Sequence, residues 1–405
     1  MKKILCFSLM VALFFAVGSP VFAADGIEVS DIGYYSRFQG QGITLTVYNW
    51  GEYIADGSDG SPDVNKEFEG LTGIKVNYIT FATNEQMYAK LKGEGAALYD
   101  IIIPSDYMIA RMIREDMVEK LDFDNIPNYA LVDELYRNLE HDATNEYSVP
   151  YMWGLVGLIY NTEMVEEEIT SWDALWDERY KGNIIMFDNP RDAFGISLAR
   201  LGYSMNTDDA DELEEAAEEL KKQKSLVQAY MMDEIFNKME GGEAIVAPYY
   251  AGDALTMMEE NPDLAFVFPD EVTNLFVDSF VIPKGSQNKE AAEMYINFMC
   301  EPEISAANAG YIGYSTPISE AFDLLDLDED EISIAYPDED IIANSEVFRD
   351  LGDETNKLMD RLWTDVRSYN VRGRQWIAPV ALLVAVIVSG GIVVIRSKKR
   401  RKEAL

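Results

Sequence analysis

Short apolar segments alternate with amphipathic helical segments from Gly42 to Arg372, and this alternation constrains the fold more than any other feature of the chain. Alternating strands and helices are typical of α/β proteins with parallel sheets. The apolar segment 100–104 (DIIIP) suits a strand that is covered on both faces of such a sheet. We expect strands at 43–50, 74–79, 100–104, 183–187, 244–250, 264–269 and 276–283, and helices at 63–70, 84–91 and 208–224.

The length of this region predicts more than one domain. It holds roughly 330 residues, which exceeds what one compact hydrophobic core usually organises. We therefore expect two α/β domains.

Carboxylates and aromatic residues gather where the expected strands end. In open α/β sheets, ligands bind beyond the carboxyl ends of the strands. Arg191 is the one basic residue in these positions, so the ligand should be cationic and partly apolar. The residues that follow the strand ends are Trp50, Glu52, Tyr53, Ser105, Asp106, Tyr107, Asp188, Asn189, Asp192, Tyr250 and Asp253.

A linear polyamine fits these residue types. It carries ammonium groups that are separated by methylenes, and carboxylates bind ammonium groups through charge-assisted hydrogen bonds. Aromatic ring faces pack on methylenes and attract the cations. Because an isolated buried carboxylate is unfavourable, such a site should stay open or hydrated until the ligand arrives.

The two ends of the chain have the patterns of targeting and membrane segments. Residues 1–23 join a basic start, an apolar stretch and small residues before Ala24, which is typical of a secretory signal peptide. Residues 24–42 follow as a polar leader with weak expected structure. Residues 376–395 are uncharged and apolar over a length that can cross a bilayer, and the basic residues in 396–405 place that end in the cytoplasm. We expect an extracellular body that a single C-terminal transmembrane helix anchors to the cell membrane.

Charge and rare residue types exclude several functions. The chain has 33 basic and 72 acidic residues, and such a surface repels nucleic acid and attracts cations. Cys300 is the one cysteine left after removal of residues 1–23, so no disulfide or thiolate metal site is expected. His141 is the only histidine and lies in a segment with the composition of an exposed loop. We expect no metal, no cofactor and no enzyme activity.

Several segments, in order along the chain, resemble the periplasmic spermidine/putrescine-binding proteins of polyamine ABC importers, a family of extracellular solute-binding proteins. The resemblance covers nearly all of the chain from Ile43 to about Arg367. Its segments include YNWGEYI from Tyr48, DIIIPSDY from Asp100, YSVPYMWG from Tyr147, TSWDALWDERYKGNI from Thr170, FVDSFVIP from Phe276 and GYSTP from Gly313.

The resemblance implies a type II-like periplasmic-binding-protein fold with two lobes that close on the ligand across a hinge near Val149 and Asp278. Lobe 1 would comprise 43–149 and 277–322, and lobe 2 would comprise 150–276 and 323–372. It also implies a monomeric ectodomain that delivers its ligand to ABC permease subunits.

The resemblance further implies a set of ligand contacts, carried over position by position. Asp253 and Gly51 are additional candidates, Gly51 because it takes the place of a polar side chain. The implied contacts are Trp50, Glu52, Tyr53, Ser105, Tyr107, Asn189, Asp192, Tyr250, Phe276, Asp278 and Tyr314.

Tyr250 and Phe276 stand at positions that are tryptophans in the spermidine-binding members of the family, and Gly51 replaces a polar side chain. Two further positions change the charge or the length of an acid. Asn189 replaces a carboxylate, and Asp192 is one methylene shorter than the glutamate of the family. Fewer charges favour putrescine over spermidine, and Asp253 compensates if it faces the cleft.

Structural roles remain open for most of these residues. The aromatic residues could belong to the core, and Ser105 or Asp192 could cap a helix. Asp278 is the hardest to explain in this way, because a carboxylate within an apolar strand needs a partner.

Other functions also remain open. The same scaffold could bind another organic cation or an amino acid. An extracellular hydrolase with a carboxylate pair would need a separation that the sequence does not define. A receptor ectodomain would need a signalling partner, since residues 396–405 are too few for a signalling domain.

Overall fold

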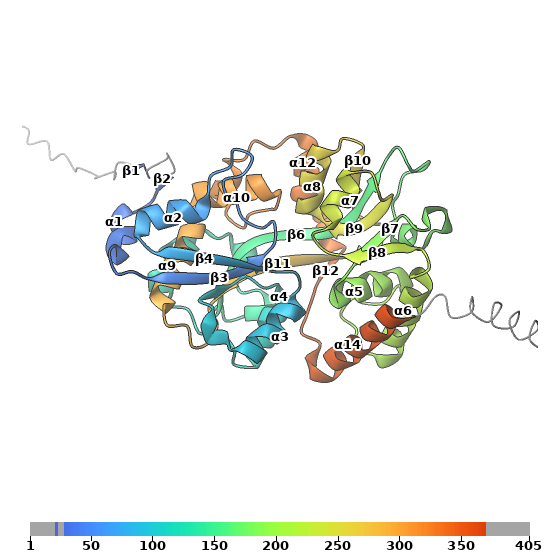
Figure 1. Ribbon diagram of the computed structural model, residues 1–405, viewed down its shortest axis with the longest axis horizontal. Coiled ribbons are helices and arrows are strands. Elements are labelled where there is room, and N and C mark those ends of the chain that lie inside the picture. Colours follow the sequence, from blue (N-terminus) through green and yellow to red (C-terminus); the bar gives the residue numbers. More distant parts are fainter. Residues whose placement is uncertain (1–20, 23–27, 370–405) are drawn as a thin grey trace, which may run out of the picture.

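The computed structural model describes residues 21–22 and 28–369 and shows an α/β molecule with two halves that share one sheet (Figure 1). The sheet has ten strands, with the order β4-β3-β5-β11-β6-β9-β7-β8, while β10 pairs with β6 and β12 pairs with β11. Its strands are β3 (Thr44–Trp50), β4 (Lys75–Phe81), β5 (Ile101–Ile102), β6 (Ser148–Asn161), β7 (Ile184–Phe187), β8 (Val227–Met231), β9 (Val246–Tyr250), β10 (Leu264–Val267), β11 (Thr273–Val281) and β12 (Ser345–Val347).

The first half of the molecule contains β3, β4 and β5, which pair in parallel as their apolar sequences predict. It is on the left in Figure 1, where helices lie above and below these strands. The helices of the first half are α2 (Val64–Thr72), α3 (Asn84–Glu94), α4 (Asp106–Arg114), α9 (Lys289–Met299), α10 (Pro302–Ile312) and α11 (Ser319–Phe322).

The second half contains β7, β8 and β9, of which β7 pairs in parallel with both neighbours. It is on the right in Figure 1. Its helices are α5 (Pro190–Leu201), α6 (Ala210–Gln223), α7 (Ile235–Glu240), α8 (Ala251–Glu260), α12 (Glu329–Ala335), α13 (Glu339–Ala343) and α14 (Gly352–Ser368).

Strands β6 and β11 join the two halves. All residues of β6 are buried. Its first part pairs with β11 from Ser148 to Leu155, and its second part pairs with β9 and β10. The register between β6 and β11 shifts at Asp278, and such a bulge bends a strand and re-aims its side chains. The one acid that the sequence placed inside a strand therefore lies at an irregular point where the halves meet.

The predicted strands are all present, with differences of a few residues at their ends. The sequence pattern missed β8, β12 and the whole of β6, whose 14 residues include two glycines and a proline. It named only three of the helices, among them 208–224, which the structure shows as α6 (Ala210–Gln223).

The leader is ordered where the structure describes it, so the expectation of weak structure is wrong for residues 28–38. Strand β2 (Glu28–Val29) pairs with β1 (Val21–Phe22) and precedes helix α1 (Ile32–Tyr35), which Asp31 caps. The Tyr35 side chain is fully buried, and its hydroxyl donates to Glu301 Oε1 over 2.6 Å. The leader is thus packed into the first half.

His141 is half-buried in a 3-10 helix (Glu140–Asp142), so the expected exposed loop is wrong. Burial lowers the pKa of its imidazole to about 4. His141 does not line the cavity described below.

Several expectations for the two ends of the chain concern residues that the structure does not describe. These are the signal peptide apart from Val21 and Phe22, the membrane segment 376–395 and the tail 396–405. Across residues 21–22 and 28–369, none of the helices is both long and apolar enough to span a lipid bilayer.

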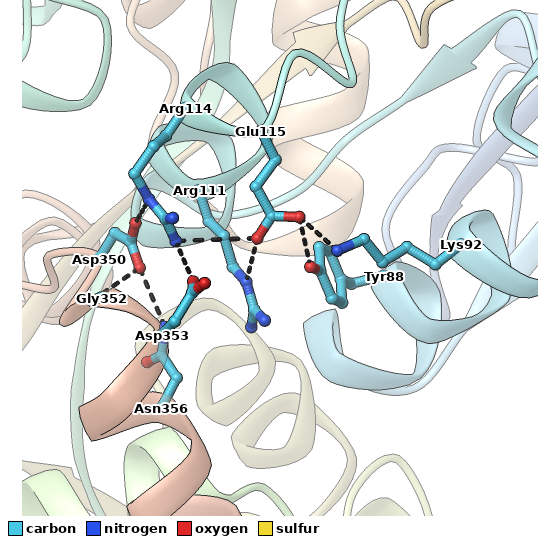
Figure 2. A network of polar contacts seen from close by, with 9 residues as sticks. All are labelled: Tyr88, Lys92, Arg111, Arg114, Glu115, Asp350, Gly352, Asp353 and Asn356. Carbon is cyan, nitrogen blue, oxygen red and sulfur yellow. Dashed lines mark hydrogen bonds and ion pairs between the residues drawn. The ribbon is translucent and has the colours of Figure 1, made fainter.

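A polar network connects the two halves at a distance from the sheet (Figure 2). Arg114 at the end of α4 contacts Asp350 over 2.6 Å and Asp353 over 2.9 Å, and both acids lie at the start of α14. The Glu115 carboxylate extends this network within the first half, because it accepts hydrogen bonds from the Tyr88 hydroxyl and the Lys92 ammonium group. The ion pairs of Arg114 therefore join the first half to the second.

Candidate functional site

A cavity lies where the ends of β3, β7 and β9 meet the middle of β11, and its empty volume is about 610 Å³ when the open space at its mouth is included. Among residues 21–22 and 28–369, five aspartates line it, and no lysine, arginine or histidine does. The lining residues are Trp50, Gly51, Tyr53, Asn84, Ser105, Asp106, Tyr107, Asn189, Asp192, Met232, Asp233, Tyr249, Tyr250, Asp253, Asn274, Phe276, Asp278, Tyr314 and Phe348.

The structure brings together all predicted site residues except Glu52. Glu52 is exposed and has a left-handed backbone with φ of 46°, next to Gly51 and Tyr53, which do line the cavity. The additional candidate Asp253 also lines it. Of the residues that the rule on strand ends picked out, all but Glu52 and Asp188 line the cavity.

Asp278 has an unpaired oxygen inside the cavity. Its side chain is 5% exposed, and its Oδ1 has no hydrogen-bond partner among the described residues. The hydroxyl of Tyr53 and the indole Nε1 of Trp50 are likewise buried and unpaired. Burial raises the pKa of Asp278 to about 7, although the neighbouring Ser105 and Tyr53 hydroxyls act in the opposite direction. A buried donor or acceptor without a partner is rare, so these groups indicate a place for a ligand.

Asp192 lies in the first turn of α5, and Asn189 is the residue that caps this helix. The Asn189 amide and the Tyr250 hydroxyl both donate to Asp192 Oδ2, over 2.5 and 3.0 Å. Burial raises the pKa of Asp192 to about 7, although the hydrogen bond from Tyr250 lowers it. The structure thus assigns the capping role to Asn189 and leaves Asp192 facing the cavity.

Ser105 caps α4 by position, but its side chain makes no capping hydrogen bond. Asn84 Nδ2 donates instead to Ser105 Oγ and to the Tyr107 hydroxyl, each over 3.1 Å. The Tyr107 hydroxyl in turn donates to Glu85 Oε1 over 2.9 Å. Asn84 therefore holds two predicted site residues in position.

Asp106, at the start of α4, lines the cavity and connects this helix to β11. Its carboxylate accepts from the backbone N–H groups of Tyr107 and Val277, over 2.6 and 3.2 Å. Burial raises its pKa to about 8, against the effect of these two hydrogen bonds. The contact with Val277 ties the start of α4 to β11 directly beside Asp278.

A row of aromatic rings forms one wall. Ring centroids are 5.4 Å apart for Tyr250 and Phe276, 6.1 Å for Phe276 and Tyr314, and 4.8 Å for Tyr314 and Tyr53. Tyr314 packs so closely on Gly252 that a Cβ there would lie 2.2 Å from the ring. The row offers continuous ring surface for an apolar chain with charged ends.

Asp253 follows Gly252 at the start of α8. Burial raises its pKa well above the usual range, the Tyr314 hydroxyl lowers it, and the charges of Asp233, Glu52 and Asp278 raise it further. In the absence of a cation, the acids of this cavity therefore repel one another.

Sequence reasoning missed several lining residues, and some of them left a signal. Asn84 follows the end of β4, and Asn274 alternates with Phe276 and Asp278 along β11. Met232 and Asp233 follow β8, a strand that was not predicted. Phe348 comes after the three-residue β12 and packs under Arg191, with 4.0 Å from Cζ to the ring centroid. No periodic pattern marks that position.

The chain is similar to known binding proteins over most of its length. Residues 64–335 match the family described as bacterial extracellular solute-binding protein. The spermidine/putrescine-binding periplasmic protein of Salmonella typhimurium is 37% identical over 76% of this chain and 88% of its own length. The putrescine-binding periplasmic protein SpuD of Pseudomonas aeruginosa is 31% identical over 80% of this chain and 92% of its own.

Solved structures agree with these similarities. A putative spermidine/putrescine ABC transporter protein from Listeria monocytogenes has a TM-score of 0.76 and 39% identity, over 81% of this chain and 99% of that one. A spermidine/putrescine ABC transporter substrate-binding protein from Streptococcus pneumoniae has a TM-score of 0.67 and 37% identity, over the same shares of the two chains. The expected α/β periplasmic-binding-protein fold is confirmed.

Proposed function

The chain belongs to the bacterial extracellular solute-binding proteins, and we propose from this that it is the substrate-binding subunit of an ABC importer for polyamines such as putrescine and spermidine. The observation that carries the proposal is the buried, unpaired Oδ1 of Asp278, which lies in a cavity that, within the part of the chain the structure describes, is lined by five aspartates and no basic residue. An ammonium group supplies the donors and the positive charge that this oxygen lacks.

The remaining lining residues suit the rest of a polyamine. Asp192 and Asp253 offer carboxylates beyond Asp278, and the aromatic row offers ring surface for methylenes. We propose Trp50, Tyr53, Ser105, Tyr107, Asn189, Asp192, Tyr250, Asp253, Phe276, Asp278 and Tyr314 as ligand contacts, with Glu52 at the rim.

We propose that the two halves act as lobes that close on the ligand. Lobe 1 comprises 43–149 and 277–322, and lobe 2 comprises 150–276 and 323–372. The crossing strands β6 and β11 support a hinge at their junction, because they carry the chain between the halves. The closed, monomeric ectodomain then docks on permease subunits, and no covalent chemistry is involved.

We also propose that residues 376–395 cross the membrane as one helix, with 396–405 in the cytoplasm and the binding lobes outside. The uncharged apolar stretch and its basic flank support this topology. Deletion of 376–405 should release the protein from the membrane fraction of cells that lack the permease. Retention of the shortened chain in that fraction would contradict the anchor.

Calorimetric titration of the purified chain with putrescine, spermidine and spermine tests the binding role. We expect micromolar or tighter binding of at least one of them. Asp278→Asn should weaken it by about 30-fold or more, because a buried charged pair is worth at least about 2 kcal/mol. The matched control is Asp340→Asn in the exposed helix α13, which should leave binding unchanged.

A folded protein that shows neither heat nor thermal stabilisation with any of the three would exclude the polyamine role. A different organic cation or an amino acid would then be the next candidate. An amino acid needs a partner for its carboxylate, and the lining residues include no basic side chain for it.

A further inference from the structure

Asp233 contacts Gly51 across the mouth of the cavity. Asp233 follows β8 in the second half, Gly51 follows β3 in the first half, and both line the cavity. A Cβ added at Gly51 would lie 2.3 Å from Asp233 Oδ2 and 3.3 Å from its Cγ, and no other group lies within 4 Å of it. The Asp233 carboxylate therefore occupies the space that a side chain at position 51 would need.

The surroundings of Asp233 are acidic. Among the other described residues, none donates a hydrogen bond to the Asp233 carboxylate or forms an ion pair with it. Burial raises its pKa, and the charges of Glu234 and Glu52 raise it further. Asp233 is itself an exposed residue, and the cavity that it lines also contains the buried, unpaired Tyr53 hydroxyl and Asp278 Oδ1. Asp233 thus adds a carboxylate to a cavity that already has unpaired buried groups.

The aromatic row sets the order of the carboxylates along the cavity. Asp192 is bonded to Tyr250 at one end of the row. Tyr314, toward the other end, packs on Gly252, which precedes Asp253. Asp278 lies beside the Tyr53 hydroxyl, at that same other end of the row. Asp233 contacts Gly51, next to the Tyr53 end, so it belongs with Asp253.

We propose that Asp233 is a further ligand-binding residue, which together with Asp253 binds the terminal ammonium group of the polyamine at the end of the cavity opposite Asp192. The inference rests on the proposed polyamine function. This site has the neutral Asn189 at a position where the resemblance implies a carboxylate, and Asp233 supplies a carboxylate at another position. Because Asp233 meets Gly51 only when the two halves are together, the bound ammonium also stabilises the closed form.

Neutralising substitutions at two adjacent acids test the inference. Asp233→Asn should weaken the binding of putrescine and spermidine at least about tenfold, since a carboxylate–ammonium contact is lost. Glu234→Gln removes the same charge from the neighbouring residue, which does not line the cavity, and should change affinity less than about threefold because its effect is screened. Equal effects of the two substitutions would overturn the inference.

A double-mutant cycle tests the contact across the mouth. Gly51→Ala should weaken binding at least about tenfold, because its methyl group collides with the Asp233 carboxylate and turns it away from the ammonium group. In an Asp233→Ala background the collision is absent, so the same substitution should have less than about a threefold effect. Additive effects would show that the two residues do not meet in the bound protein and would overturn the inference.

The outcomes separate the inference from the proposed function. If the unaltered chain binds none of the polyamines, the proposed function fails. If it binds them while Asp233→Asn behaves like Glu234→Gln, the inference alone fails. Thermal unfolding of each variant without ligand identifies any loss of folding.

Discussion

Asn189 donates a hydrogen bond to Asp192 over 2.5 Å, to the same oxygen that accepts from the Tyr250 hydroxyl. Asn189 also accepts from the backbone N–H of Arg191, so one amide caps α5 and holds a carboxylate of the cavity. The departure from the family at this position thus gives Asp192 a neutral donor where the resemblance implies a second negative charge.

Asn189→Asp should destabilise the ligand-free protein at pH 8. The substitution preserves the cap, but it removes the donor and places two buried carboxylates side by side, which costs about 1–3 kcal/mol. Protonation of either carboxylate at pH 5.5 relieves the repulsion. Thermal unfolding at both pH values checks this, and an equal loss of stability at both would contradict it.

Polyamine affinity should fall as the pH falls from 8 to 6. Asp192 and Asp278 have pKa values of about 7 in the ligand-free fold, and an ammonium group binds their ionised forms. Each carboxyl therefore lowers the affinity by about tenfold per pH unit below its pKa. Titration calorimetry across this range measures the effect, and a pH-independent affinity would contradict it.

The stability of the ligand-free protein should change in the opposite direction. Between about pH 4 and 7 these two carboxyls bind protons in the folded protein and release them in the unfolded chain, where aspartate titrates near 3.9. Their contribution to stability is therefore lost as the pH rises through about 7. Denaturant unfolding at pH 5.5 and 8, with Asp192→Asn and Asp278→Asn as references that lack each group, isolates it.

Arg114→Gln should weaken polyamine binding by about two- to fivefold, mainly through faster dissociation. Its pairs with Asp350 and Asp353 join the halves, yet its side chain is 42% exposed, and exposed pairs contribute about 0.2–1 kcal/mol. Stopped-flow release of ligand at low and high salt measures the change.

Arg179→Gln is the matched control, because Arg179 pairs with Asp177 within the second half. It should leave the dissociation rate unchanged. The same rate increase for both variants would show that the Arg114 pairs do not act between the halves.

Tyr35→Phe should destabilise the protein by about 1–3 kcal/mol, since it leaves Glu301 and Asn297 without their buried hydroxyl partner. Ile32→Ala, at an exposed position of the same helix, should have little effect. Urea unfolding followed by circular dichroism compares the two, and equal stability of both variants would show that the leader does not support the fold.

The sequence predicted the parts of the fold that repeat a local pattern. The parallel strands of each half carry runs of apolar residues, and the ends of these runs were enough to identify Trp50, Asn189 and Asp253 as candidate site residues. Strand β6 was missed because it is buried along its entire length and so has no alternation of polar and apolar residues. The short strand β8 is only partly buried, and missing it hid Asp233.

Contacts between distant segments could not be read from sequence. Nothing in the leader indicates that Tyr35 packs against Glu301, and nothing near Phe348 indicates that its ring enters the cavity. Such contacts depend on how the halves assemble, which no local pattern encodes.

The last described helix, α14, packs on α6 in the second half, and Lys224 binds the carbonyl oxygen of Val366 at its C-terminal end. If the proposed anchor follows α14, the membrane holds the second half in place, and the first half moves relative to it. Opening would then swing Trp50 and Asp278 away from the bilayer-tethered wall of the cavity. A fluorophore on the first half should consequently show wider excursions relative to the membrane than one on α14, and ligand should narrow them.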